Sequence, residues 1–171
     1  HNRCRRQRQM CIRDRHNLVS DVIAVIRDTG ATQATVVGHD WGGAVAWQVA
    51  FNAPEVVQNL VILNLPHPNG MARELANNPE QQRNSAYARR FIEGSAEDPD
   101  IMFGGPMNPQ TLARWVQDPA AKVLYEAAFA RSSFNGMLNF YKANYPRAGQ
   151  PSPVATSEPL PKLPMPVLIF H

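Results

Sequence analysis

Cysteine is almost absent from this sequence, with two in 171 residues, and both Cys4 and Cys11 lie in the first 15 residues. A disulfide framework or a cysteine-ligated metal site is therefore excluded for the rest of the chain. A run of about 18 apolar residues, which a membrane helix needs, is also missing. So are the glycine-rich fingerprints of dinucleotide sites and phosphate loops. We expect no membrane association, no metal site and no cofactor.

Positive charge is concentrated at one end of the chain. The formal charge of +3 and the pI of about 9.1 would together suggest an acidic partner such as nucleic acid. However, residues 1–15 hold six of the 17 basic residues and one of the 14 acidic ones, so the remainder carries 11 basic and 13 acidic side chains. Because this remainder is slightly acidic, we expect no nucleic-acid partner.

The arginine-rich residues 1–15 are open to several interpretations. They could be a transit peptide or a nucleic-acid-binding arm, but a transit peptide should begin with Met and be rich in Ser, and this segment is neither. The run RQRQMCIRDR resembles translated sequencing-adapter sequence. We predict a non-native or disordered tail that packs against nothing.

With the tail set aside no export signal remains, so a cytoplasmic location is expected. The sequence carries no signal for an oligomeric state.

Beyond the tail, helical spacing of apolar residues alternates with short apolar runs. The runs at 34–37 and 60–65 are rich in branched side chains, which is typical of strands buried on both faces. Helical patterns lie before Gly30, which suits a helix end, and at 44–53. This alternation is typical of an α/β fold with a doubly wound parallel sheet. We therefore predict a core fragment over residues 16–66.

Residues 67–145 lose the strand pattern and favour helices separated by Asn-Pro, Asp-Pro and Gly-Gly breakers. Because this all-helical block lies between two predicted strands, we interpret it as an inserted cap. Seven of the 15 prolines lie in 146–166, which indicates a semi-rigid connector, assigned to 146–165. Residues 166–171 then return to the core as a truncated strand. The helices expected in the cap are at 70–77, 79–93, 109–117, 120–132 and 135–144.

Residues 38–43, Gly-His-Asp-Trp-Gly-Gly, join the first predicted strand to the helix that follows. They fit the pattern Gly-x-nucleophile-x-Gly, in which small neighbours allow a nucleophile to occupy a strained strand-to-helix turn. An Asp there is ionised without help and can attack an electrophilic carbon to form an ester. Water activated by a His then hydrolyses the ester. The plain alternative is an Asp that only caps the helix.

We predict that Asp40 is the nucleophile of this turn. The backbone N–H of Trp41 would face the oxyanion, since a helix N-terminus favours negative charge. His39 is assigned to substrate binding, with a positioning role. His67, in Pro66-His67-Pro68, is interpreted as a structural hinge where the core meets the cap.

On this hexapeptide, residues 17–171 resemble the α/β-hydrolase group that contains epoxide hydrolases and haloalkane dehalogenases. The resemblance implies a partial α/β-hydrolase fold, a parallel sheet fragment with an inserted all-helical cap. Both enzyme classes share HDWGG, so this motif does not separate them. The segments 85–97 and 134–145 resemble the two cap segments that carry tyrosines in epoxide hydrolases, the second in the form Asn-aromatic-Tyr-basic.

The resemblance implies that Tyr87 and Tyr141 reach over Asp40 and hydrogen-bond the oxygen of an epoxide. Their phenols, with an ordinary pKa of about 10, can stabilise and then protonate the departing alkoxide. The expected function is thus an epoxide hydrolase that converts a small apolar epoxide into a vicinal diol. Either tyrosine alone would more commonly be a packing residue.

Two alternatives remain open. A haloalkane dehalogenase would use the same aspartate, but it needs a second halide-binding donor besides Trp41, and Trp115 lies in no recognisable halide motif. Asn64 occupies the position where one dehalogenase subgroup has its catalytic acid, and an amide cannot replace a carboxylate. We therefore expect the acid and the base beyond His171. The other alternative is a non-catalytic fragment, because we expect the base, the acid and the second oxyanion donor to be missing from this chain. Three parallel strands with an open edge and uncovered apolar faces also indicate a fragment. By itself, this chain is expected to be inactive.

Overall fold

The computed structural model describes residues 15–145 and 160–171, which group into two compact units. The first combines the described parts of residues 1–82 and 146–171, and the second is residues 83–145. Because the division falls after residue 82, the helical segment 68–82 groups with the sheet. The predicted tail, at residues 1–14, and most of the predicted connector lie outside the described residues.

The first unit is built on a parallel sheet of three strands in the order β1-β2-β3. In β1 and β2, Thr35 pairs with Asn59 and His39 with Leu63, so the carboxyl ends of the two strands lie at the same edge of the sheet. The strands are β1 (Ala34–His39), β2 (Val57–Leu63) and β3 (Val167–Phe170). The helices that accompany them are α2 (Arg15–Asp28), α3 (Trp41–Asn52), the short η1 (Pro54–Val56) and α4 (Pro68–Asn77). All three predicted strands are confirmed.

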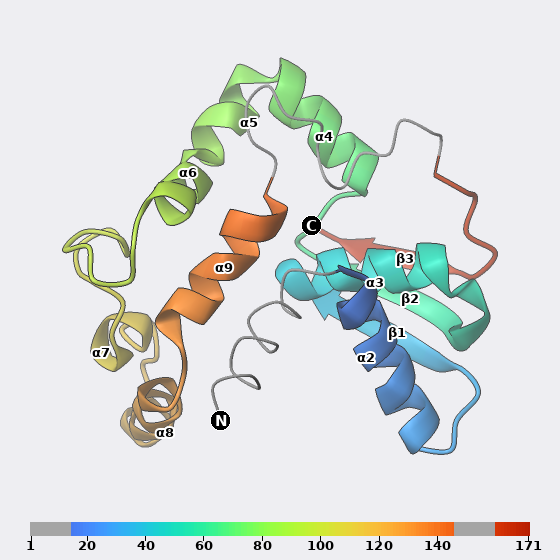
Figure 1. Cartoon of the computed structure of the whole chain (residues 1–171), viewed down its shortest axis with the longest axis horizontal. Coiled ribbons are helices and arrows are strands. Elements are labelled where there is room, and N and C mark those ends of the chain that lie inside the picture. Colours follow the sequence, from blue (N-terminus) through green and yellow to red (C-terminus); the bar gives the residue numbers. More distant parts are fainter. Residues whose placement is uncertain (1–14, 146–159) are drawn as a thin grey trace. The chain divides into compact units, whose positions relative to one another are not determined.

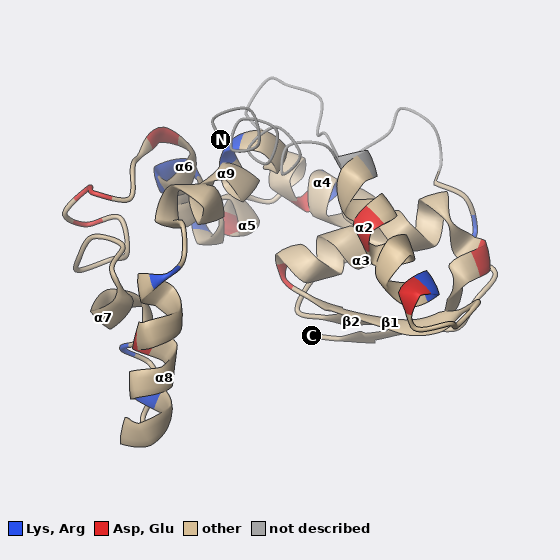
Figure 2. Cartoon of the chain, turned by 60° about the horizontal axis from the view of Figure 1, so that its bottom comes forward, with Lys and Arg blue, Asp and Glu red and all other residues tan. Residues whose placement is uncertain are grey.

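One face of this sheet is covered by α2 and α3, which lie on the same side of it in Figure 2. The helix α3 contains no charged residue, and it buries Trp47, Val49 and Ala50 against Leu60 and Ile62 of β2. Fully burying a side chain such as leucine contributes roughly 1.5–3 kcal/mol. This interface therefore anchors the helix that begins at the predicted nucleophile.

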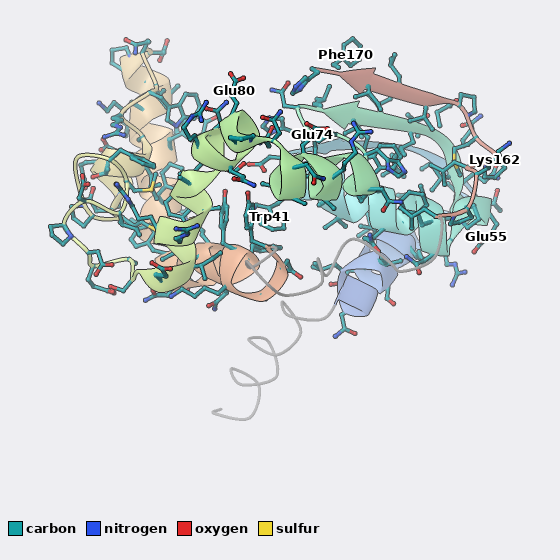
Figure 3. The ribbon with its side chains drawn as sticks, turned by 90° about the horizontal axis from the view of Figure 1, so that it is seen from above. Trp41, Glu55, Glu74, Glu80, Lys162 and Phe170 are labelled. Carbon is teal, nitrogen blue, oxygen red and sulfur yellow. The ribbon has the colours of Figure 1, made fainter. Side chains whose placement is uncertain are left out.

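The opposite face of the sheet is not covered by any described element. Val37 is 59% exposed, and the four residues of β3 are between 39% and 53% exposed. The prediction that β1 is buried on both faces is therefore wrong for the described chain, because both neighbouring helices lie on one side. Figure 3 shows Phe170 at the carboxyl end of β3 and Lys162, which precedes the strand, toward its other end.

The second unit is entirely helical and has its own small core. Its helices are α6 (Ala86–Glu93), α7 (Pro109–Leu112), α8 (Pro119–Ala130) and α9 (Phe134–Asn144), and α5 (Pro79–Asn84) spans the boundary between the units. Figure 1 shows α6 and α9 as neighbours. The core consists of Phe91, Ile101, Met107 and Leu138, with Ala96 beside them. The single helix predicted at 79–93 is two helices, because the chain leaves helical geometry at Ser85.

An aromatic cluster links α3 to the start of α4 within the first unit. The ring of His67 meets Trp47 edge-on at a centroid distance of 5.1 Å and Phe51 at 5.7 Å. Its Nδ1 atom accepts a hydrogen bond from the backbone N–H of Asn69 at 3.2 Å. An acceptor nitrogen must be unprotonated, so the ring is neutral in this arrangement. Burial lowers the pKa of His67, because it removes water from the charged form of the ring. This contact fits the hinge interpretation.

The cluster predicts that the first unit loses stability in acid. Because the pKa of His67 is lowered in the folded state, the unfolded chain binds the proton more tightly. The free energy of unfolding should therefore fall as the pH drops below the ordinary histidine value of 6.5, until the folded-state pKa is passed. Denaturant unfolding between about pH 8 and about pH 5 measures this slope. His67→Gln should flatten the slope, and an unchanged slope would contradict the assignment.

Candidate active site

The turn between β1 and α3 holds Asp40 in a strained backbone conformation. Its φ of 52° and ψ of −123° lie in a region that residues other than glycine rarely occupy. The Asp40 N–H donates to the Leu63 carbonyl at 3.3 Å, and the Asp40 carbonyl accepts from Ala44 N–H at 3.1 Å. The strand ladder on one side and the helix on the other thus fix the residue at the carboxyl edge of the sheet.

Two glycines make this tight turn possible. A Cβ atom on Gly38 would collide with the backbone of Gly42 and lie 2.7 Å from Cα of Gly43. At Gly43, an added Cβ would lie 3.3 Å from the Gly38 carbonyl oxygen and 3.3 Å from the Leu65 side chain. A Cβ at Gly42 would meet nothing within 4 Å. The close approach of strand and helix therefore depends on Gly38 above all.

The side chains of the turn differ in their exposure and in their hydrogen bonds. Asp40 is exposed and occupies the N-cap position of α3, yet its side chain makes no capping hydrogen bond. Such a bond is what an aspartate at an N-cap normally provides. The capping alternative therefore does not account for this residue. Trp41 is the first residue of α3 and is partly buried, whereas His39, the last residue of β1, is exposed.

The two predicted cap tyrosines lie next to each other in the second unit. Tyr87 is on α6 and Tyr141 is on α9, and their rings meet edge-on with centroids 6.1 Å apart. Phe91 contacts both of them, at 5.6 Å from Tyr87 and 4.9 Å from Tyr141. Tyr87 is 38% exposed and Tyr141 is partly buried. Both phenols therefore belong to one aromatic cluster.

Sequence reasoning missed two neighbours of this cluster. Tyr145 stacks on Tyr141 with ring centroids 6.2 Å apart. Burial raises the pKa of Tyr145, and a hydrogen bond with Ser85 partly opposes the rise. Lys142 donates from Nζ to the carbonyl of Gly94 at 2.7 Å. Lys142 occupies the basic position of the motif Asn-aromatic-Tyr-basic, and this was the sequence signal that could have identified it.

The remaining sequence candidates lie elsewhere. Asn64 follows β2 with a positive φ of 52° and donates its N–H to the Phe170 carbonyl at 2.9 Å. Trp115 is 62% exposed and packs edge-on against Tyr125 at 5.2 Å. His171 is exposed beyond β3. Within 15–145 and 160–171, no cluster of His, Cys, Asp or Glu could hold a metal ion, and no helix is long and apolar enough to cross a membrane.

Comparison with known proteins identifies the family of this chain. The sequence profile of the alpha/beta hydrolase fold matches residues 7–157. The chain belongs to the α/β-hydrolase fold family. The fold class predicted from the sequence is therefore confirmed. The strained Asp40 turn occupies the strand-to-helix position at which members of this fold carry a nucleophile.

Solved α/β-hydrolase structures similar to this chain include epoxide hydrolases. A mutant of an epoxide hydrolase from Bacillus megaterium is 31% identical with a TM-score of 0.69, and the match covers 91% of this chain and 57% of that one. Another mutant of an epoxide hydrolase from Bacillus megaterium, with its product bound, is 30% identical with a TM-score of 0.70 and the same coverage.

Curated relatives match a shorter part of this α/β-hydrolase chain. Epoxide hydrolase 4 of Homo sapiens is 36% identical over 70 residues, which are 41% of this chain and 19% of that protein. The AB hydrolase superfamily protein YfhM of Bacillus subtilis (strain 168) is 40% identical over 74 residues, which are 43% of this chain and 26% of that protein. The chain thus aligns with about a fifth to a quarter of these relatives and with 57% of the similar structures.

The glycine geometry predicts opposite outcomes for two alanine substitutions in the turn. Gly38→Ala should destabilise the protein by on the order of 1–3 kcal/mol, because the new methyl group meets backbone that cannot move aside. Gly42→Ala is the matched control. It adds the same methyl group in open space within a helix, so stability should be unchanged or up to about 1 kcal/mol higher. Thermal unfolding of both variants is the measurement. Equal stability of the two would refute the close approach at Gly38.

Proposed function

We propose that the protein containing this chain is an epoxide hydrolase that opens its substrate through a covalent ester on Asp40. The observation that carries the proposal is the conformation of Asp40: a strained N-cap aspartate that is exposed and makes no capping bond. Strain of this kind costs on the order of 1–3 kcal/mol and persists where the surrounding structure imposes it. A carboxylate that contributes nothing to the helix end and is still held in this geometry is suited to attack.

In the first chemical step, a carboxylate oxygen of Asp40 attacks a carbon of the epoxide ring. The carbon–oxygen bond of the ring breaks as the ester bond forms, and the ring oxygen leaves as an alkoxide. A phenol of Tyr87 or Tyr141 gives its proton to this alkoxide. The products of the step are a hydroxyalkyl ester on Asp40 and a phenolate, which recovers a proton from solvent.

In the second step, water hydrolyses the ester and releases a vicinal diol. The oxyanion that forms on the ester carbonyl is stabilised by the backbone N–H of Trp41, at the first turn of α3. His39 lies beside Asp40 at the end of β1 and is assigned to positioning in this site. Activation of the water needs a general base. That base is not His67, because its Nδ1 accepts from Asn69 and aromatic rings pack against it.

The adjacent tyrosines support an epoxide over a halide as the leaving group. The Tyr87 and Tyr141 rings are in contact, with centroids 6.1 Å apart, and a pair of neighbouring phenols suits an oxygen that needs donors and a proton. A departing halide takes no proton. One similar structure is an epoxide hydrolase that binds a naphthyloxy-substituted diol as its product. Together with the aromatic surroundings of the tyrosines, this supports a small apolar epoxide as the substrate.

Replacement of the nucleophile is the first test of the proposal. In the full-length protein, Asp40→Asn should abolish diol formation, at least about a thousandfold, while the fold survives because the side chains are nearly isosteric. Asp28→Asn, at the exposed end of α2, is the control and should be fully active. Mass spectrometry of the wild-type protein quenched during turnover should find the ester on the peptide that contains Asp40. An ester on another residue would overturn the assignment.

The tyrosine pair provides a second, independent test. Tyr87→Phe and Tyr141→Phe should each lower the kcat for epoxide opening by about tenfold to a hundredfold, because one donor remains, and the double change should nearly eliminate turnover. Tyr125→Phe, on α8, removes a phenol outside the cluster and should have no effect. Full epoxide-opening activity of the double variant would exclude the phenols as proton donors. Rapid release of halide by that variant would instead favour a haloalkane dehalogenase.

A further inference from the structure

The lysine that follows the second tyrosine binds the end of the helix that carries the first. Lys142 is partly buried in the last turn of α9. Its Nζ donates to the carbonyl oxygen of Gly94 at 2.7 Å. Gly94 is the C-cap residue of α6. This hydrogen bond therefore connects the helix of Tyr141 to the end of the helix of Tyr87, in addition to the ring contacts that Tyr141 makes with Tyr87 and Phe91.

The chemistry of a helix end explains why a lysine suits this position. The last carbonyl groups of a helix have no donor within the helix, and the helix dipole places partial negative charge there. An ammonium group supplies both a hydrogen bond and the opposite charge. The Gly94 N–H donates to the Arg90 carbonyl and closes α6. The backbone is extended at Gly94, with φ −89° and ψ −179°, and its carbonyl accepts from Lys142 instead of from the helix.

The acceptor of this bond is held rigidly. A Cβ atom on Gly94 would lie 2.7 Å from Oδ2 of Asp98 and 2.8 Å from the Arg90 carbonyl, so the turn closes tightly around the glycine. Asp98 accepts from the Ser95 N–H at 2.8 Å and from its hydroxyl at 3.0 Å. Those two bonds, followed by the charge of Lys142, lower the pKa of Asp98.

A weaker contact joins the same turn to the beginning of α9. The side-chain oxygen of Asn135 accepts from the Ala96 N–H at 3.4 Å, and its amide nitrogen donates to Glu97 at 3.4 Å. The turn after α6 therefore makes hydrogen bonds with both ends of α9, through Asn135 at its beginning and Lys142 in its last turn. Of these contacts, the bond from Lys142 is the short, charge-assisted one, and Lys142 is next to Tyr141 in the chain.

We propose that Lys142 is a positioning residue, which keeps the Tyr141 phenol in register with that of Tyr87 by binding the C-terminus of α6. Preorganised donors stabilise a transition state because they need not reorganise when charge develops. Loss of the bond from Lys142 to Gly94 would weaken the connection between α6 and α9 and let the two phenols separate. The catalytic part of this inference rests on the proposed function. The structural part concerns only the distance between two rings.

The activity test uses the full-length protein and an aryl glycidyl ether. Lys142→Met should lower kcat by about tenfold to a hundredfold with little change in KM, because a displacement of about 1 Å is costly in the transition state. Lys142→Arg should restore most of the rate, since a guanidinium also donates to a carbonyl. Lys122→Met, which removes a lysine from α8, should behave as wild type. Full activity of Lys142→Met would overturn the proposal.

A double-variant cycle separates positioning from general stability. If Lys142 acts through the phenol of Tyr141, Lys142→Met should cost little more in a protein that already carries Tyr141→Phe. A lysine that only stabilises the fold would give the same loss in both backgrounds, and that result would overturn the inference. Thermal unfolding of each variant shows whether a rate loss follows stability.

A readout without catalysis keeps this inference distinct from the proposed function. In protein with labelled tyrosines, nuclear Overhauser contacts should join the Tyr87 and Tyr141 rings and should weaken in Lys142→Met but not in Lys122→Met. Contacts that persist in Lys142→Met would overturn the positioning role. If the contacts weaken as expected while wild-type protein opens no epoxide, the positioning stands and the proposed function fails.

Discussion

The candidate site depends on the close approach of two backbone segments. These are Gly38, near the end of β1, and Gly42, in the first turn of α3. This constraint can be met because Gly38 has no Cβ atom. With the strand end and the helix start this close, Asp40 has to take the strained φ and ψ that connect them. Its carboxylate is then exposed at the carboxyl edge of the sheet, where parallel α/β folds place their ligands.

The constraint is effective only because both sides of the turn are anchored. On the strand side, β1 pairs with β2 in a parallel ladder that continues to the bond between Asp40 and Leu63. On the helix side, α3 buries Trp47 and Val49 against the sheet. Strain of a few kcal/mol in one residue is small compared with these contacts. The core therefore supplies the free energy that keeps Asp40 in a conformation it would not adopt alone.

The second unit uses a different means to place its functional groups. Its tyrosines are positioned by ring packing around Phe91 and by hydrogen bonds to the turn after α6, with ordinary helical backbone beneath them. The two units therefore hold their candidate residues by different means, backbone strain at Asp40 and side-chain packing at the tyrosines.

The sequence alone determined those features that depend on local patterns. The third strand, at 167–170, followed from a short apolar run, and the turn at Asp40 followed from glycine spacing between a strand and a helix. Such signals are local because steric limits on φ and ψ act within a few residues. The family resemblance added Tyr87 and Tyr141 as candidates that act on one oxygen, but it gave neither the distance between their rings nor the contacts that hold them.

Tertiary structure decided everything that depends on which surfaces meet. It left Val37 exposed because α2 and α3 cover the same face of the sheet, and it divided the helix expected at 79–93 at Ser85. It brought the Tyr87 and Tyr141 rings to 6.1 Å and placed Lys142 on the carbonyl of Gly94, 48 positions earlier in the chain. Contacts between such distant residues arise from the packing of whole helices, and no local pattern in the sequence encodes them.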